Sequence, residues 1–216
     1  MEKFGLSLFE HLNSLSFIQR VDIFRQIVEL VQHVHQNNFT LGDIKPENIL
    51  VKKDEEGTFD VRLIDFDFSI DHNEKQRQDN FIKRGTLEFM SPESLFSDKI
   101  DFFKADVWAL GVTMFELFNT TEKESLFSDA IDLLHKRNRK QIIWDTHYEA
   151  KCLESYKNDT FSPLFTRSNL THNSYQKLFT RLETILQGML QITPSQRWDI
   201  NEVDQYLNEA LIEFAN

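Results

Sequence analysis

The sequence predicts a mostly α-helical protein with one small β-hairpin, folded as a single domain over residues 1-216. Apolar residues recur at steps of three and four along several long segments, which is typical of helices that bury one face. Only two short runs show the alternation of strands, and turn residues separate them. The chain contains 20 Phe but only 6 Gly and 4 Pro, so core-forming residues are plentiful and helix breakers are few.

The first long segment with helical spacing runs from Ser16 to Asn38. Its apolar stripe includes Ile18, Val21, Phe24, Val28 and Val31. A stripe of this kind indicates a helix whose apolar face is buried. We therefore expect a long, well-buried helix that ends at the polar pair Asn37-Asn38.

Two short extended runs follow this helix, at residues 48–52 and 59–65. The residues between them, Asp54 to Gly57, have the chemistry of a tight turn, so the two runs are predicted to pair as a hairpin. After the hairpin, the polar stretch from Asp71 to Lys83 has no periodicity. We expect that stretch to be a flexible loop.

The most apolar segment extends from Ala105 to Phe118 and is apolar on nearly all sides. A helix of this kind belongs at the centre of a domain. The region from Thr120 to Asn173 has a weaker pattern, which predicts one helix near Leu126–His135 followed by irregular chain. Helical spacing returns in Tyr175–Gln191 and in Ile200–Phe214.

Charge and composition exclude several classes of partner. The net charge of −11 should repel phosphate backbones and anionic lipid surfaces, so we expect no nucleic-acid partner and no membrane partner. No apolar stretch approaches the roughly 20 residues that cross a bilayer, and the N-terminus lacks the apolar region of a signal peptide. A single cysteine, Cys152, cannot form an internal disulfide. The sequence therefore predicts an intracellular, cytoplasmic protein.

A short loop between the predicted long helix and the hairpin carries three kinds of polar group. Asp43 supplies a carboxylate, Lys45 an ammonium group and Asn48 an amide, while Pro46 stiffens the loop. Phosphoryl transfer uses an acidic residue to orient the attacking hydroxyl, a cation to offset developing charge, and oxygen ligands to hold magnesium. The second strand of the hairpin then ends at Asp65, whose carboxylate can bind a hard cation.

In order and spacing, the motifs of this chain resemble those of the eukaryotic protein kinases. Six motifs follow one another between about Leu30 and Arg197: the catalytic loop (Leu41-Gly42-Asp43, with Asn48), the D-F-G position (Asp65-Phe66-Asp67), the substrate-docking loop (Gly85 to Met90), the A-P-E position (Ser91-Pro92-Glu93), the start of the central helix (Asp106 to Gly111) and the late arginine motif (Pro194 to Arg197). A chance match of six ordered motifs is implausible.

The resemblance implies the fold of a kinase C-terminal lobe, with the small N-terminal lobe absent. Residues 1-14 would form the hinge and a first helix, and residues 15-38 the long helix. The catalytic loop and hairpin would occupy 39-66, the activation segment 67-93, and a helical subdomain 94-216.

The resemblance also implies roles for the polar residues. Asp43 would be the catalytic base and Lys45 the cation that contacts the transferred phosphate. Asn48 and Asp65 would be the cofactor-binding residues, as the metal ligands that hold Mg²⁺ and, through it, ATP. Lys45 together with Thr86 is typical of the serine/threonine branch of the family.

Three further residues would support the site. Glu93 and Arg197 would form the family's buried ion pair, which joins the activation segment to the last helices. Asp106 would accept hydrogen bonds from the backbone of the catalytic loop.

The sequence departs from the family pattern at three places. Gly42 replaces the arginine that pairs with a phosphate group on the activation loop. A phosphorylated activation loop would therefore lack its usual cationic partner. Asp67 replaces the glycine of D-F-G, where it either disfavours the active turn or adds a cation ligand. Nothing ahead of the catalytic loop resembles the family's glycine-rich loop or its strand lysine, and the residues at Met1 to Leu8 resemble the hinge.

Two hypotheses of function follow. The first is a serine/threonine protein kinase that transfers phosphate from ATP to protein hydroxyls when a small lobe is supplied; the four intact polar residues support it. The alternative is a pseudokinase C-lobe that acts as a scaffold or anchoring module, which the missing lobe, Gly42 and Asp67 support. In either case we expect little or no ATP turnover by this chain alone. We also expect an apolar small-lobe face that binds a protein partner.

Overall fold

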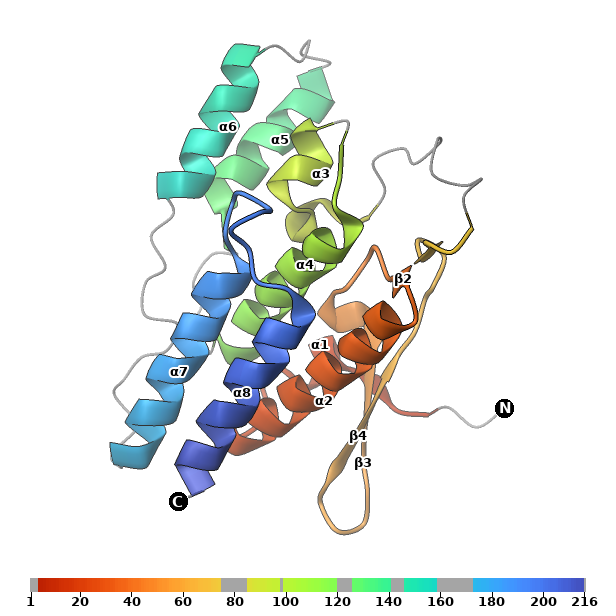
Figure 1. Cartoon of the computed structure of the whole chain (residues 1–216), viewed down its shortest axis with the longest axis vertical. Coiled ribbons are helices and arrows are strands. Elements are labelled where there is room, and N and C mark those ends of the chain that lie inside the picture. The colour runs from red at the N-terminus through yellow and green to blue at the C-terminus, as the bar shows by residue number, and fades with distance from the viewer. Residues whose placement is uncertain are drawn as a thin grey trace.

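The computed structural model of the chain describes residues 4–74, 85–97, 99–119, 126–140, 146–158 and 173–215. The described chain is mostly helical with small sheets, as the sequence predicts (Figure 1). Helices α2, α7 and α8 pack side by side, α5 packs on α6 at the other end, and α4 lies between these groups. The helices are α1 (Leu8–His11), α2 (Phe17–Gln36), α3 (Pro92–Phe96), α4 (Phe102–Phe118), α5 (Ser128–Lys140), α6 (Thr146–Asn158), α7 (Asn173–Met189) and α8 (Ile200–Ala215).

The long helix α2 confirms the first helical prediction. Ser16 caps its first turn: the Ser16 N–H donates to Gln19 Oε1 at 2.9 Å, and the Gln19 N–H donates to Ser16 Oγ at 3.4 Å. At the other end Asn38 takes a left-handed backbone with φ 65°, which an asparagine tolerates well. The apolar stripe between these ends is buried, with Ile23, Phe24 and Ile27 inaccessible to solvent.

Helix α4 is the centre of the core, as its all-round apolar sequence predicts. The Asp101 side chain caps it by accepting from the Lys104 N–H at 3.1 Å. Most of its later residues are buried, and Trp108, Leu110 and Met114 are fully inaccessible. Because α4 contacts α2, α7 and the strand β2 (Phe39–Thr40), it fixes the loop that follows β2 relative to the helices.

The predicted hairpin is present as strands β3 (Ile49–Lys53) and β4 (Phe59–Leu63), which pair in register from Ile49↔Leu63 to Lys53↔Phe59. Asp54 stabilises the turn, because its Oδ1 accepts from the Thr58 N–H at 2.8 Å. Strand β1 (Leu6–Ser7) adds to the other edge of β3 in antiparallel orientation. The hairpin projects from the helical body in Figure 1.

A second, two-stranded sheet was not predicted. It pairs β2 with β5 (Ile70–Asp71), with Thr40 opposite Ile70. Strand β5 ends at Asp71, the first residue of the flexible loop that was expected over Asp71–Lys83. Residues 75–83 of that loop lie outside the described residues.

The prediction for the region from Thr120 to Asn173 was wrong in one respect. The helix expected near Leu126–His135 is present as α5, but α6 also forms where irregular chain was expected. Helix α6 buries Cys152 and Tyr156 among several charged residues, so its apolar stripe is too short to stand out in sequence. Among the described helices, none is both long and apolar enough to cross a membrane.

A buried ion pair joins α3 to the segment before α8. Arg197 Nη1 lies 2.6 Å from Glu93 Oε1, and Arg197 Nη2 lies 2.9 Å from Glu93 Oε2. Arg197 is 1% exposed, and it also donates to the carbonyl oxygens of Gln191 and Lys104. The pair that the resemblance implied is therefore present, with the guanidinium fully hydrogen-bonded.

Candidate active site

The loop that carries Asp43 lies between β2 and β3 and closes with a short 3-10 turn, Pro46–Asn48. Pro46 suits the start of this turn because its fixed φ is already near the helical value. The Asn48 N–H donates to the Lys45 carbonyl oxygen at 3.0 Å, which completes the turn. This turn brings the side chain of Asn48 back toward Asp43.

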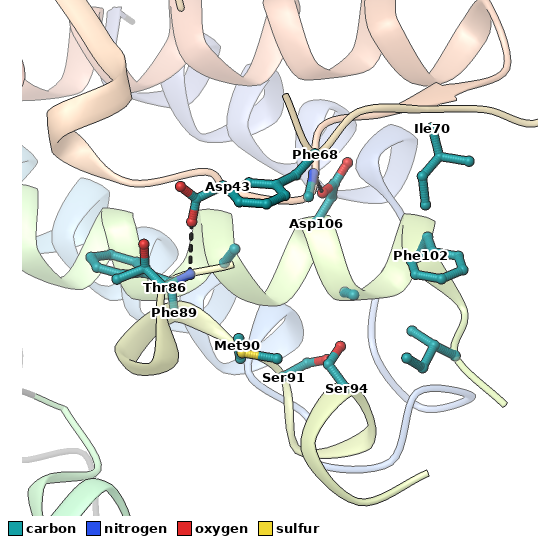
Figure 2. Close-up of a pocket in the computed structure, with 14 residues that line it drawn as sticks. Asp43, Phe68, Ile70, Thr86, Phe89, Met90, Ser91, Ser94, Phe102 and Asp106 are labelled. Atoms are coloured by element: carbon teal, nitrogen blue, oxygen red, sulfur yellow. Dashed lines mark hydrogen bonds between the residues drawn. The ribbon is translucent and has the colours of Figure 1, made fainter. Parts of the chain in front are cut away.

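The Asp43 carboxylate is the centre of a compact polar cluster. Its Oδ2 lies 2.7 Å from Lys45 Nζ and accepts from Asn48 Nδ2 at 3.0 Å. Its Oδ1 accepts from the Thr86 N–H at 2.9 Å, the hydrogen bond drawn in Figure 2. Asp43 is only 6% exposed, so these contacts replace most of its hydration. The structure thus brings three of the four predicted site residues into direct contact.

Thr86 belongs to the same cluster, although sequence reasoning did not include it among the site residues. Lys45 Nζ donates to Thr86 Oγ1 at 2.6 Å, while the Thr86 N–H holds Asp43. Thr86 comes from a different part of the chain, just before the 3-10 turn Leu87–Phe89. The sequence did contain a signal for Thr86. The Gly85-Thr86 pair resembles the start of the family's substrate-docking loop, which implies a position near the site.

The surroundings of Asp43 act in opposite directions on its pKa. Burial raises the pKa of this carboxyl group, but the hydrogen bonds and charge of Lys45 and the hydrogen bonds of Thr86 lower it, and the net pKa is below its usual value. Asp43 is therefore ionised at neutral pH. An ionised carboxylate in a fixed position can orient a hydroxyl group and accept its proton.

Asp106, in the first turns of α4, fixes the backbone just ahead of Asp43. Its Oδ2 accepts from the Leu41 N–H at 2.7 Å, and its Oδ1 accepts from the Gly42 N–H at 2.9 Å. This confirms the expectation that Asp106 binds the catalytic-loop backbone. His35 of α2 adds a contact that was not predicted, with its Nε2 at 3.0 Å from Asp106 Oδ2. Three elements thus converge on one buried carboxylate.

Asp65 is the predicted site residue that the structure does not join to the others. It is exposed, has a left-handed backbone with φ 64°, and its Oδ1 accepts from the Asp67 N–H at 3.5 Å. Within the described ranges no hydrogen bond or ion pair links it to Asp43 or Asn48. Its backbone is nevertheless near Asn48, because the Ile64 N–H donates to the Asn48 carbonyl oxygen at 3.0 Å.

The side-chain oxygen atoms of Asn48 and Asp65 are suitable ligands for a hard cation. Asn48 Nδ2 donates to both the carbonyl oxygen and the carboxylate of Asp43, at 2.9 and 3.0 Å, so the amide oxygen is the atom left for another ligand. Magnesium prefers such amide and carboxylate oxygens and keeps several of its waters. In the part of the chain that the structure describes, His, Cys, Asp and Glu side chains form no group of three or more that could hold a metal. The pair therefore stays a predicted magnesium site.

A second acidic group, Glu116 of α4, is partly buried and lies near Glu47 and Glu88. Burial raises its pKa to about 7, and the nearby carboxylates of Glu47 and Glu88 contribute in the same direction. Its folded-state pKa is thus above the ordinary value of 4.5 that we assume for the unfolded chain. The charged form is the disfavoured one, so Glu116 lowers the stability of the fold progressively as pH rises from about 4.5 to about 7.

We expect Glu116→Gln to stabilise the protein more at pH 8 than at pH 5, by about 2 kcal/mol, because the amide carries no charge to desolvate. Urea unfolding at the two pH values measures this difference. The matched control is Glu209→Gln, on the exposed side of α8, which should change stability equally at both pH values. An equal effect of Glu116→Gln at both pH values would contradict the prediction.

Comparison with known proteins gives several matches. The family model described as the protein kinase domain matches residues 3–207. Sperm motility kinase 2A of Mus musculus is 32% identical over 156 residues, which cover 71% of this chain and 28% of that protein. Sperm motility kinase 2B of the same organism is 30% identical over 165 residues, covering 75% of this chain and 32% of that protein.

A third relative comes from a different organism. A protein of Acanthamoeba polyphaga mimivirus, whose name includes serine/threonine-protein kinase R436, is 37% identical over 103 residues, covering 46% of this chain and 34% of that protein. The matched segments therefore span only 28–34% of the length of these three relatives.

Proposed function

Because this chain belongs to the protein kinase family, we propose that it forms the C-terminal lobe of a serine/threonine protein kinase. In that protein it would transfer phosphate from ATP to protein hydroxyl groups. One observation carries the proposal: Lys45, Asn48 and Thr86 all bind the buried Asp43 carboxylate. A surface carboxylate without a function is normally hydrated. The Asp43 carboxylate instead has three side-chain or backbone partners, which come from two separate segments of the chain.

Each residue of the cluster has a distinct task in this proposal. Asp43 Oδ2 orients the hydroxyl of the substrate and accepts its proton as the oxygen attacks phosphorus. Lys45 lies 2.7 Å from that carboxylate, where its charge can also stabilise the transferred phosphoryl group. Thr86 holds both side chains in place, which reduces the ordering needed at the moment of reaction.

ATP and Mg²⁺ are the proposed cofactors. Asn48 and Asp65 would hold the cation, which neutralises charge on the phosphate oxygens when it is bound. For Asp65 to take part, its exposed side chain has to turn toward Asn48, whose carbonyl oxygen already accepts from the neighbouring Ile64 N–H. A cytoplasmic location and the absence of a nucleic-acid partner stay predictions from the sequence.

Several exposed apolar side chains support the proposal that another lobe or protein covers this domain. Four large apolar side chains are exposed on β1, α1 and the turn after β4: Leu6 (42%), Phe9 (58%), Ile64 (38%) and Phe66 (55%). A contiguous patch of exposed apolar side chains is typical of an interaction surface. We propose that these four side chains form such a patch, which we call the small-lobe face, and that it binds the protein segment that completes the nucleotide site.

The proposal is tested by adding a small lobe to this chain. We assay residues 1–216 alone and a chimera in which the small lobe of an active protein kinase is fused ahead of them. Both are given Mg²⁺ and ATP with serine, threonine and tyrosine peptides. We expect transfer to serine or threonine by the chimera and little by the chain alone. Robust transfer by the chain alone would refute the need for a small lobe, and transfer to tyrosine only would refute the substrate class.

A second candidate function is a pseudokinase scaffold. The D-F-G position supports it, since Asp67 replaces glycine there and Asp65 has no bond to the Asp43 cluster among the described residues. A scaffold would bind its partner through the small-lobe face without nucleotide. A folded chimera that binds no ATP, together with partner binding that Phe9→Ser abolishes, would favour this candidate.

A further inference from the structure

A cavity of about 60 Å³ lies between the catalytic loop, the substrate-docking loop and the first half of α4 (Figure 2). One water molecule needs roughly 10–15 Å³ of such space, so the cavity has room for a small molecule. In Figure 2, Asp43 and Phe68 lie on one side of the cavity, and Met90 and Ser91 lie on the other. Three small residues in its lining leave the space open: Gly42, Ala105 and Ala109.

Apolar side chains form most of the cavity wall. They come from four parts of the chain and include Phe68, Ile70, Phe89, Met90, Ile100 and Phe102. Among the described residues that line the cavity there is no Lys, Arg or His, whereas the carboxylates of Asp43 and Asp106 are both present. A ligand with a negative charge would therefore meet repulsion and no cation, which excludes anions from this cavity.

The polar side chains that line the cavity already have partners. Asp43, Asp106 and Thr86 all take part in the hydrogen bonds that hold the catalytic loop. Ser91 and Ser94 bind each other, with their Oγ atoms 2.7 Å apart. A polar ligand would compete with these bonds, but an apolar ligand leaves them intact. The wall thus favours an uncharged, apolar ligand.

The cavity borders the hydrogen bond that joins the two loops. The Thr86 N–H donates to Asp43 Oδ1 at 2.9 Å, and both residues line the cavity. A molecule inside the cavity contacts both loops, and its binding surface is lost when the loops separate. Because such a ligand binds only the joined arrangement, it stabilises that arrangement by mass action.

We propose that this cavity is a regulatory site for a small, uncharged apolar molecule of about the size of a branched alkyl group. The bound molecule holds Thr86 on Asp43. The effect on catalysis rests on the proposed function, in which Asp43 is the base. Binding itself depends on neither nucleotide nor turnover, so it can be measured on residues 1–216 alone.

NMR of the chain with dissolved 2-methylpropane tests the proposal. We expect saturable shifts of the Thr86 and Ala109 amides, which belong to the cavity wall, and no shifts in α8. At a ligand concentration equal to Kd, hydrogen exchange of the Thr86 amide should slow about twofold. Trimethylammonium has a similar shape but a positive charge, and it should bind about tenfold more weakly because burial of its charge is costly.

Ala105→Leu is the variant that fills the cavity. Ala105 lies on α4 and is only partly exposed, so the longer side chain extends into the cavity and should abolish binding of 2-methylpropane. The matched control is Ala150→Leu on the exposed side of α6, which should leave binding unchanged. Amides of α8 show whether each variant remains folded.

Met90→Ala provides a second variant if Ala105→Leu does not fold. It removes the thioether group from the wall and enlarges the cavity, so benzene, which fits apolar cavities of about 150 Å³, should bind this variant more tightly than the wild type.

Several outcomes would overturn the proposal. They are no saturable binding of 2-methylpropane, equal or tighter binding of trimethylammonium, and binding that leaves Thr86 exchange unchanged. Equal binding by Ala105→Leu and Ala150→Leu, or no gain of benzene binding in Met90→Ala, would also overturn it. Absence of phosphoryl transfer by the chimera, with ligand binding intact, would count against the proposed function only.

Discussion

Arg197→Met lowers the free energy of unfolding by about 3–5 kcal/mol, because it leaves the Glu93 carboxylate buried without its partner. The lost interactions are two parallel hydrogen bonds to Glu93, at 2.6 and 2.9 Å, and bonds to backbone carbonyl oxygens. Arg197 also stacks on the Trp108 ring, 4.9 Å from its centroid. Urea unfolding of wild type and variant measures the loss.

The control for this prediction is the pair Arg181–Glu213, which joins α7 and α8 at 2.9 Å with both side chains more than 40% exposed. Water solvates its charges in either state, so Arg181→Met should cost at most about 1 kcal/mol. The double variant Arg197→Met, Glu93→Gln should recover part of the stability, since no buried charge is then left unpaired. Equal costs for the two single arginine variants would show that burial does not govern the effect.

Asp43→Asn should slow phosphoryl transfer by the chimera about 10²–10⁴-fold, the usual contribution of a positioned acid or base. The amide can still accept from the Thr86 N–H, but it cannot take a proton from the substrate and it no longer attracts Lys45 by charge. The fold should be retained. Single-turnover rates with saturating ATP measure the effect on chemistry rather than on binding.

Asp60→Asn is the control for the catalytic prediction. Asp60 lies in β4, is exposed, and has only a loose contact of 3.6 Å with Arg62. Its substitution should leave the transfer rate within about twofold, since surface changes of this kind have small effects. A rate for Asp43→Asn close to that of Asp60→Asn would remove Asp43 from the catalytic role.

Sequence reasoning predicted the elements whose signal is local. The helices α2, α4, α7 and α8 have apolar patterns several turns long, and the hairpin has turn residues between alternating strands. The motif order, in turn, brought Asp43, Lys45 and Asn48 together correctly. The helix and hairpin predictions depend on residue spacing within one stretch of chain. The site prediction depends on a family pattern whose motifs are known to lie close together in space.

The features that the sequence did not predict depend on distant contacts. Strands β2 and β5 are only two residues long, too short for any periodicity to mark them. Gly42 also lies close to Phe68, since a Cβ at Gly42 would be 2.7 Å from the Phe68 carbonyl oxygen. In the sequence, Gly42 indicated only a replaced arginine and not this backbone contact. For Asp65, the sequence predicts a contact that the structure does not show. Its motif predicts a site shared with Asn48, but the order of motifs does not determine the direction of an exposed side chain.

The deep position of Cys152 has a practical consequence for studying the protein. It is the single cysteine of the chain and is fully shielded from solvent, so thiol reagents should leave the native protein unlabelled. A cysteine introduced at Glu55, in the exposed hairpin turn, would then be the one reactive thiol. A fluorophore attached there would report when a second protein approaches, with the native chemistry of the interior left undisturbed.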